Sequence, residues 1–176
     1  MRKFSVLDLV LAAMVAALYA VMGYFGNVFG LTFGPVQVRF AEALTVLPVL
    51  FPAAAPGLAV GCLITNLLSP YGPVDVIFGT LATAIAAWIT MKMPRWYLAA
   101  LPPILVNALI LPPIWAWAEV GAVNPAFWTA CGFNALTFIP GEALACYVLG
   151  TVLLKALSQA RVLRPAMRRE AQAPTA

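Results

Sequence analysis

The chain has 176 residues, of which 64% are hydrophobic and only 9% are charged. A soluble domain averages about 45–50% apolar and about 25% charged residues, so this composition excludes an ordinary soluble domain and indicates an integral membrane protein. The formal net charge of +4 does not indicate nucleic-acid binding, because the basic residues gather at the two termini and in one loop.

Apolar runs predict membrane-spanning helices in chain order. We expect the first run to be a span and not a cleavable signal sequence. The expected spans are Val6 to Phe25, Ala41 to Pro52, Gly57 to Leu68, Val74 to Met91, and Trp96 to about Trp117. A glycine-rich loop, residues 26–40, separates the first two spans and is too interrupted to form a helix. A basic loop, Lys92 to Arg95, precedes the fifth span, and a polar connection, Glu119 to Pro125, follows it.

The last apolar stretch, Ala126 to Leu157, is too long for one perpendicular span at about 1.5 Å per residue. We expect its first part, with Phe127 and Trp128, to lie along the interface or in the loop, and the sixth span to run from about Leu136 to Leu157. The predicted fold is therefore an all-α integral membrane bundle of about six transmembrane helices. It has one domain, residues 1–160, and a basic, disordered tail, residues 161–176.

Basic residues predict the orientation, because cytoplasmic loops carry an excess of lysine and arginine. With an even number of spans, nine of the ten basic residues fall on the side of the two termini. We therefore expect a multi-pass plasma-membrane protein with both termini in the cytoplasm. The exception is Arg39, in a long extracellular loop after the first helix.

Polar groups at matching depth on several spans predict a binding site in the outer half of the bilayer. Counting from the basic anchors places Glu142 about 20 Å, Asn107 about 18 Å and Asn66 about 15 Å from the inner edge. Glu42 and Asp75 open the second and fourth spans from outside. Phe78 and Trp115 could stack on a flat ligand there, or could belong to an interfacial aromatic belt.

Structural roles for the same residues remain open. Asn66 and Asn107 could bond neighbouring helices, and Asp75 could cap the fourth helix. Arg39 and Glu42 could form an ion pair that ties the loop to the second span. Glu119 is interpreted as a solvated loop carboxylate. Glu142 is hardest to explain structurally, because it follows Pro140-Gly141 and has no basic neighbour in the sequence.

Other residue types narrow the chemistry further. The chain has no histidine, which removes histidine-based zinc sites and serine–histidine triads, and we expect no metal or cofactor. Cys62, Cys131 and Cys146 lack metal-ligand spacing and are interpreted as small buried hydrophobic residues. Small residues recur every four positions on the first span, at Ala12, Ala16 and Ala20. Such a stripe lets helices approach closely, either inside the bundle or against a partner.

Five ordered segments together carry a family resemblance. They are VQVRFAEALTVLPVLFP, AAPGLAVGCLITNLL, VDVIFGTLATAIAAW, LPPILVNALILPP and PGEALACYVLG. Over residues 7–157 the chain resembles the QueT-like substrate-binding (S) components of energy-coupling-factor (ECF) transporters. The resemblance implies a bundle of about six helices that captures queuosine precursors, the 7-deazaguanine bases, from outside. It also implies association with a transmembrane coupling protein and two cytoplasmic ATPases, with Ala12, Ala16 and Ala20 as the docking surface.

The polar residues suit such a ligand. A carboxylate such as Glu142 can accept from the adjacent ring N–H and amino group of a deazaguanine, and Asn107 can donate to its carbonyl. The loop with Arg39 would close over the site. The chain has no Walker motif, so ATP hydrolysis would come from partners.

Two other functional classes remain open. A stand-alone secondary transporter of a nucleobase or another vitamin is compatible with six spans. An intramembrane enzyme would have to rely on a carboxylate pair, for which Glu42 and Glu142 are the sole candidates. We expect no enzyme activity in this chain.

Overall fold

The computed structural model describes residues 5–33 and 37–159, and within them all regular structure is helical. In chain order the helices are α1 (Val6–Val28), η1 (Phe40–Val49), α2 (Ala54–Asn66), η2 (Asp75–Gly79), α3 (Thr80–Thr90), η3 (Trp96–Leu98), α4 (Leu101–Val120), α5 (Pro125–Ala143), η4 (Leu144–Leu149) and α6 (Gly150–Gln159). The expected all-helical class is confirmed. The expected tail, residues 161–176, lies outside the described residues.

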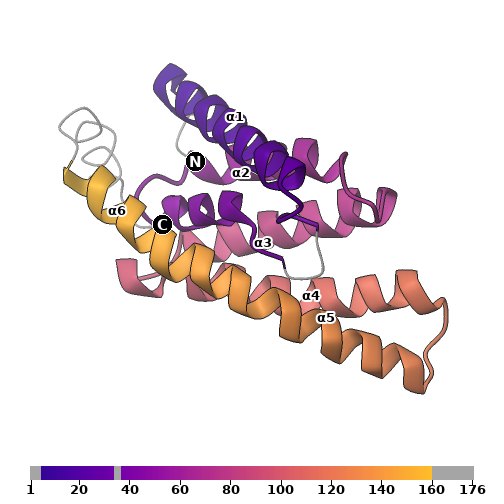
Figure 1. Cartoon of the computed structure of the whole chain (residues 1–176). Coiled ribbons are helices and arrows are strands. Elements are labelled where there is room, and N and C mark those ends of the chain that lie inside the picture. The colour runs from indigo at the N-terminus through magenta and orange to yellow at the C-terminus, as the bar shows by residue number, and fades with distance from the viewer. Residues whose placement is uncertain (1–4, 34–36, 160–176) are drawn as a thin grey trace.

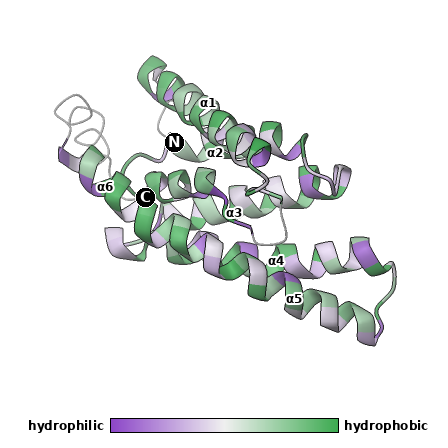
Figure 2. Ribbon diagram, viewed as in Figure 1, coloured by the Kyte–Doolittle hydropathy of each residue, from purple (hydrophilic) through white to green (hydrophobic). Residues whose placement is uncertain are grey.

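Within the described residues, three continuous helical segments are long and apolar enough to cross a membrane: Val6–Val28, Trp96–Val120 and Pro125–Gln159. Three shorter apolar segments, Phe40–Val49, Ala54–Asn66 and Asp75–Thr90, lie at the positions of the second, third and fourth expected spans. Figure 2 shows hydrophobic colour along most of the helices and hydrophilic colour at several of the connections between them. The apolar runs therefore located the helices well.

The end of the chain differs from the expectation. Instead of an interfacial piece followed by a separate span, α5, η4 and α6 form one helical segment of 35 residues that lies along α4 (Figure 1). Asn124 caps its start by accepting from the backbone N–H of Phe127, and Pro125 occupies the first helical position, where its missing N–H costs nothing. The wide turns of η4 then carry the helix on past Pro140 without a break.

The connection after α1 is shorter than expected, because α1 continues through Gly26 to Val28. Gly30 then turns the chain with a φ of 69°, a conformation that suits glycine. Thr32 follows and donates from its hydroxyl to the carbonyl oxygen of Gly23, at 3.2 Å. This bond folds the connection back against its own helix.

Helices α1 and α2 pack along a seam of small residues. A Cβ added to Gly61 would lie 2.7 Å from the Cβ of Tyr19 and 2.8 Å from the carbonyl oxygen of Ala16. One added to Gly57 would meet the backbone of Ala12. Glycine is therefore required on α2 for this close approach.

The short helix η1 forms the centre of the molecule. Every residue from Ala41 to Pro48 is buried, as expected for a helix enclosed on all sides. It packs against α1, α2, α3, η4 and α6. Glu42 is therefore carried into the middle of the bundle by an otherwise apolar element.

Candidate functional site

A carboxylate–amide pair joins α4 to α5. The side-chain N–H of Asn107 donates to Oε1 of Glu142 at 2.7 Å, and each residue is 1% exposed. The other carboxylate oxygen of Glu142 and the amide oxygen of Asn107 have no hydrogen-bond partner among the described residues. The pair thus offers two acceptors. Asn107 was expected to offer a donor to the ligand, and one of its two side-chain N–H groups is used on Glu142.

Gly141 determines what can approach this pair. A Cβ at Gly141 would lie 2.9 Å from the backbone carbon of Gln37 and 3.3 Å from the Cα of Val38. The backbone before η1 therefore passes directly over α5, one residue from Glu142. Only a residue without a side chain allows this approach.

A second buried carboxylate, Glu42 on η1, lies within the same group of charges. The hydroxyl of Tyr19 on α1 donates to its Oε1 at 2.5 Å, while Oε2 has no partner among the described residues. Glu42 interacts electrostatically with Glu142 and with Arg39. Cys146, at the start of the wide turn after α5, approaches the carbonyl oxygen of Glu42 to 3.6 Å. Both carboxylates therefore belong to one cluster.

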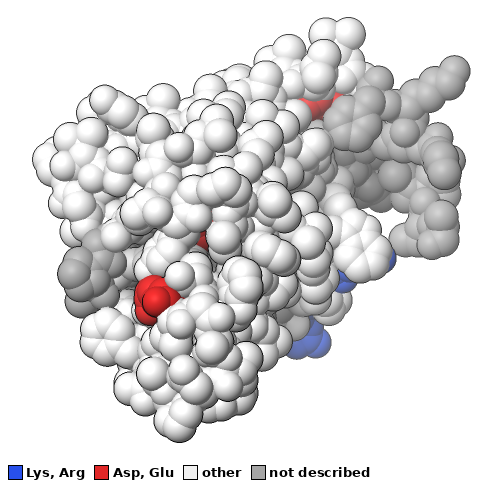
Figure 3. Space-filling view, turned by 90° about the vertical axis from the view of Figure 1, so that its right-hand side faces the viewer, with Lys and Arg blue, Asp and Glu red and all other residues white. Residues whose placement is uncertain are grey.

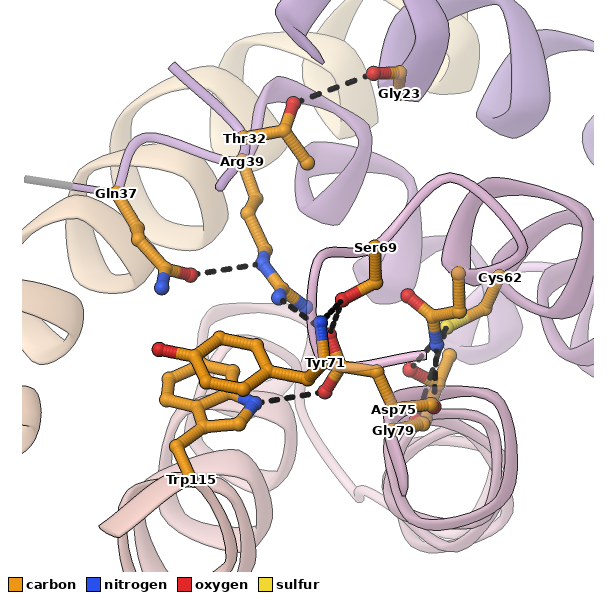
Figure 4. A network of polar contacts seen from close by, with 12 residues as sticks. Gly23, Thr32, Gln37, Arg39, Cys62, Ser69, Tyr71, Asp75, Gly79 and Trp115 are labelled. Atoms are coloured by element: carbon orange, nitrogen blue, oxygen red, sulfur yellow. Dashed lines mark hydrogen bonds and ion pairs between the residues drawn. The ribbon is translucent and has the colours of Figure 1, made fainter. Parts of the chain in front are cut away.

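Asp75 anchors the third part of the cluster (Figure 4). Its carboxylate accepts from the Ser69 hydroxyl at 2.6 Å and from the indole N–H of Trp115 at 2.7 Å. Arg39 lies 3.7 Å from the same carboxylate. The ion pair of Arg39 is therefore made with Asp75, not with Glu42 as one interpretation held. Asp75 also does not cap its helix, because its oxygens are directed at these three side chains.

Three aromatic rings lie around the guanidinium group of Arg39. Its guanidinium lies 5.3 Å from the ring centres of Phe33 and Trp115 and 5.7 Å from that of Phe138. Its Nε donates to Gln37 at 3.2 Å, whereas one terminal nitrogen, Nη2, makes no hydrogen bond. Such stacking suits the planar guanidinium. Nη2 is also the nitrogen that lies 3.7 Å from the Asp75 carboxylate, so it is ion-paired although it makes no hydrogen bond.

The unsatisfied atoms concentrate at this cluster. Among the described residues, five buried side-chain nitrogen or oxygen atoms lack a hydrogen-bond partner. Four belong to Arg39, Glu42, Asn107 and Glu142, and the fifth is the hydroxyl of Thr80. Buried polar atoms are nearly always paired, so four unpaired atoms in this one cluster need an explanation.

The remaining expected site residues differ in their burial and contacts. Trp115 is fully buried and stacks on Tyr71, with ring centres 5.7 Å apart and an interplanar angle of 18°. Asn66 donates to the backbone oxygen of Asp75 at 3.0 Å and to the sulfur of Cys62, which is the helix-tying role left open above. Phe78 is 41% exposed, so nothing in its burial favours stacking on a ligand in the cluster.

Glu119 differs from the expected solvated loop carboxylate. It lies in the last turn of α4, where it is exposed but accepts from Tyr71 at 2.8 Å and from Asn134 at 3.3 Å. Burial and the nearby Glu119 raise the pKa of Tyr71 above its usual range. Figure 3 shows how sparse charged side chains are on one face of the molecule, so such an exposed group stands out.

Several cluster residues were not expected from the sequence: Tyr19, Phe33, Gln37, Ser69, Tyr71 and Phe138. Tyr19 had a usable signal, because a hydroxyl in the middle of an apolar span needs a partner. The aromatic rings had none, since they match any membrane helix. No set of three metal-ligating side chains occurs within residues 5–33 and 37–159.

The alanine stripe of α1 lies partly inside the bundle. Ala12 and Ala16 are each 8% exposed in the seam with α2, and Ala20 is half-buried. Ala12 and Ala16 nevertheless border an apolar groove of about 290 Å³ between the two helices. Its lining residues are Leu9, Ala12, Ala13, Ala16, Pro56, Gly57 and Val60. The exposed small residue of the groove on α1 is Ala13.

Comparison with known proteins gives one family and one relative. The model of a family described as QueT transporter matches residues 9–159. The Queuosine precursor transporter QueT of Lactococcus lactis subsp. cremoris (strain MG1363) is 34% identical over 85 residues, which are 48% of this chain and 50% of the relative. The matched stretch thus spans half the length of that relative. No solved structure matches the chain.

Proposed function

We propose that this chain, which belongs to the QueT transporter family, captures a 7-deazaguanine queuosine precursor with high affinity at the cell membrane. The family is one of transporters, not of enzymes, and a similar protein is named for queuosine precursors. The observation that carries the proposal is the group of unsatisfied buried atoms on Arg39, Glu42, Asn107 and Glu142. A ligand that pairs them would remove the cost of burying them unpaired.

The atoms suit a guanine-type edge. Such an edge carries adjacent ring N–H and amino donors with a carbonyl acceptor beside them. Glu142 Oε2 and Asn107 Oδ1 have no hydrogen-bond partner and would accept from the two donors. Arg39 Nη2 lies 3.7 Å from Asp75 without a hydrogen bond, and it would donate to the carbonyl. In this assignment Glu42 remains available to the rest of the ligand. Asp75 and Trp115 hold Arg39 in place, Asn66 holds the backbone of Asp75, and Phe78 has no assigned role.

The proposed mechanism of uptake is ATP-driven and needs separate subunits. The chain has no Walker motif, so a transmembrane coupling protein and two cytoplasmic ATPases would supply the energy. The proposed topology is a single six-span domain, residues 1–160, with both termini cytoplasmic and a basic tail. The apolar groove between α1 and α2 is the proposed docking surface, with Ala12, Ala16 and Ala20 along its helix.

The test of ligand capture uses purified protein in detergent. Glu142→Gln removes the negative charge but keeps the size of the side chain, and should weaken 7-deazaguanine binding by more than about tenfold, roughly 1.4 kcal/mol. The matched control is Glu119→Gln, which changes an exposed carboxylate outside the cluster and should bind like the unmodified protein. Unchanged affinity in a folded Glu142→Gln protein would remove Glu142 from the site.

The test of coupling uses Ala13→Leu, because Ala13 is exposed in the groove whereas Ala16 is packed in the seam. Ala13→Leu should leave binding by the isolated protein intact and lower uptake by the assembled transporter severalfold. Ala17→Leu, on the same helix and exposed but not lining the groove, is the control. Uptake that survives loss of the ATPases but stops with a proton uncoupler would favour a stand-alone secondary transporter instead.

A further inference from the structure

A pocket of about 310 Å³ lies where η3 and α6 meet the end of η1, and we call it the α6 pocket. Leu154, which is 3% exposed, and the half-buried Leu50 supply its aliphatic walls. Its other lining residues, Trp96, Lys155 and Ser158, are exposed. None of the five belongs to the polar cluster, and the proposed function gives none of them a role.

The charge at the α6 pocket is positive and has no acidic partner. Within residues 5–33 and 37–159, no carboxylate forms an ion pair with Lys155, whose ammonium group lies 5.8 Å from the ring centre of Trp96. Arg95, the residue before Trp96, is basic and exposed as well. An anionic group would therefore be attracted to this pocket.

The α6 pocket also has neutral hydrogen-bond donors beside its cation. The indole N–H of Trp96 makes no hydrogen bond with any described residue. The hydroxyl of Ser158 donates to the backbone oxygen of Lys155 at 2.9 Å, but this bond is exposed. Phosphate oxygens accept from such donors, and the bonds are stronger where the donor is a cation. The lining therefore matches the chemistry of a phosphate ester.

The position of the α6 pocket favours a lipid over a soluble phosphate. Trp96 begins the apolar segment Trp96–Val120, and Lys155 lies near the end of the apolar segment Pro125–Gln159. Tryptophan and basic residues gather at such ends, where the membrane meets water. Basic pockets between membrane helices bind the headgroups of anionic lipids. Aliphatic walls suit a glycerol backbone and the first acyl carbons, whereas they offer nothing to a free phosphate.

We propose that the α6 pocket binds the headgroup of an anionic phospholipid. Its phosphate lies between Lys155 and Trp96, and its glycerol backbone lies against Leu50 and Leu154. The inference requires only that the chain lies in a membrane, and it does not depend on which solute the polar cluster takes. A lipid held there touches η1, η3 and α6 at once, so its binding should stabilise the packing of these three elements.

The experiment uses the purified full chain in detergent and two lipids with the same acyl chains. Phosphatidylglycerol has a net negative charge, whereas the choline of phosphatidylcholine balances its phosphate. Native mass spectrometry measures the lipid that the protein retains at equal lipid concentration. We expect about fivefold more phosphatidylglycerol than phosphatidylcholine to be retained, the effect of one basic residue on an anionic headgroup. Phosphatidylglycerol should also raise the thermal midpoint more than phosphatidylcholine does.

A matched pair of variants locates the effect in the α6 pocket. Lys155→Gln should lower the retention of phosphatidylglycerol about fivefold. The control is Lys92→Gln, which removes the same charge from an exposed lysine that lies over Trp88, outside the pocket. It should retain phosphatidylglycerol like the unmodified protein.

Four results would overturn the inference. Equal retention of the two lipids by the unmodified protein is the first, and it needs no variant to fold. Equal losses in Lys155→Gln and Lys92→Gln would show that overall charge attracts the lipid. Glycerol phosphate that raises the thermal midpoint as much as the lipid does would assign the pocket to a soluble phosphate ester. Unchanged lipid retention in Lys155→Gln, with lowered uptake by the assembled transporter, would assign it to a partner protein.

Discussion

The α1–α2 seam and the polar cluster are both buried and closely packed, yet they differ in whether their buried polar atoms have hydrogen-bond partners. In the seam, glycines on α2 lie against the backbone at Ala12 and Ala16, and the surfaces in contact there are apolar. In the cluster, buried donors and acceptors are left over on Arg39 and on three neighbouring residues. The described residues of the seam have no buried side-chain donor or acceptor without a hydrogen-bond partner, whereas the cluster has four. Changes in the two regions should therefore separate stability from binding.

The largest expected effect follows from removing the one cation of the cluster. Arg39→Met would leave Asp75 buried without its charge partner, and breaking a buried pair from one side costs about 3–5 kcal/mol. We expect a strongly lowered thermal midpoint in detergent without ligand. Arg95→Met, which changes an exposed arginine, is the control and should stay within about 0.5 kcal/mol of the unmodified protein.

A second variant decides whether the charge is responsible. Adding Asp75→Asn to Arg39→Met removes the unpaired carboxylate and should recover most of the lost stability, because replacing both partners of a pair is far less costly than removing one. If the double variant is no more stable than Arg39→Met alone, then the aromatic stacking of Arg39, not its ion pair, holds this region together.

A smaller effect is expected in the seam. Gly57→Ala places a methyl group against the backbone of Ala12, which cannot move aside like a side chain, and overpacking of this kind costs about 1–3 kcal/mol. The thermal midpoint should fall, while the folded fraction binds ligand with unchanged affinity. Gly132→Ala on α5 is the matched control, since no atom lies within 4 Å of the added Cβ. A loss of affinity equal to the loss of stability would show that seam and cluster are not separate.

The sequence predicted the helices and most of the polar residues of the cluster, but not their pairing. Apolar runs are local, and so was the N-cap signal of Asn124 and Pro125 that would have revealed the continuous last helix. The partner of Arg39 is not local: Glu42 is three residues away, yet Asp75, 36 residues away, makes the ion pair. Residues at matching depth can be predicted to converge, whereas which of them meet depends on helix rotation and packing.

The smallest expected effect on stability concerns Tyr71, at the edge of the cluster. Tyr71 in the turn before η2 stacks on Trp115 and donates to Glu119, but this hydrogen bond is exposed. Tyr71→Phe keeps the stacking and removes the bond, so it should cost no more than about 1 kcal/mol and leave ligand affinity unchanged. Because burial raises the pKa of Tyr71 in the folded protein, its contribution to stability is present at neutral pH. The contribution is lost as the pH rises from the unfolded value of about 10 through the raised folded value. The measurement is the thermal midpoint of both proteins between pH 7 and pH 11. Their difference should shrink at the alkaline end, whereas a difference that grows with pH would show that the hydroxyl does not remain protonated against Glu119.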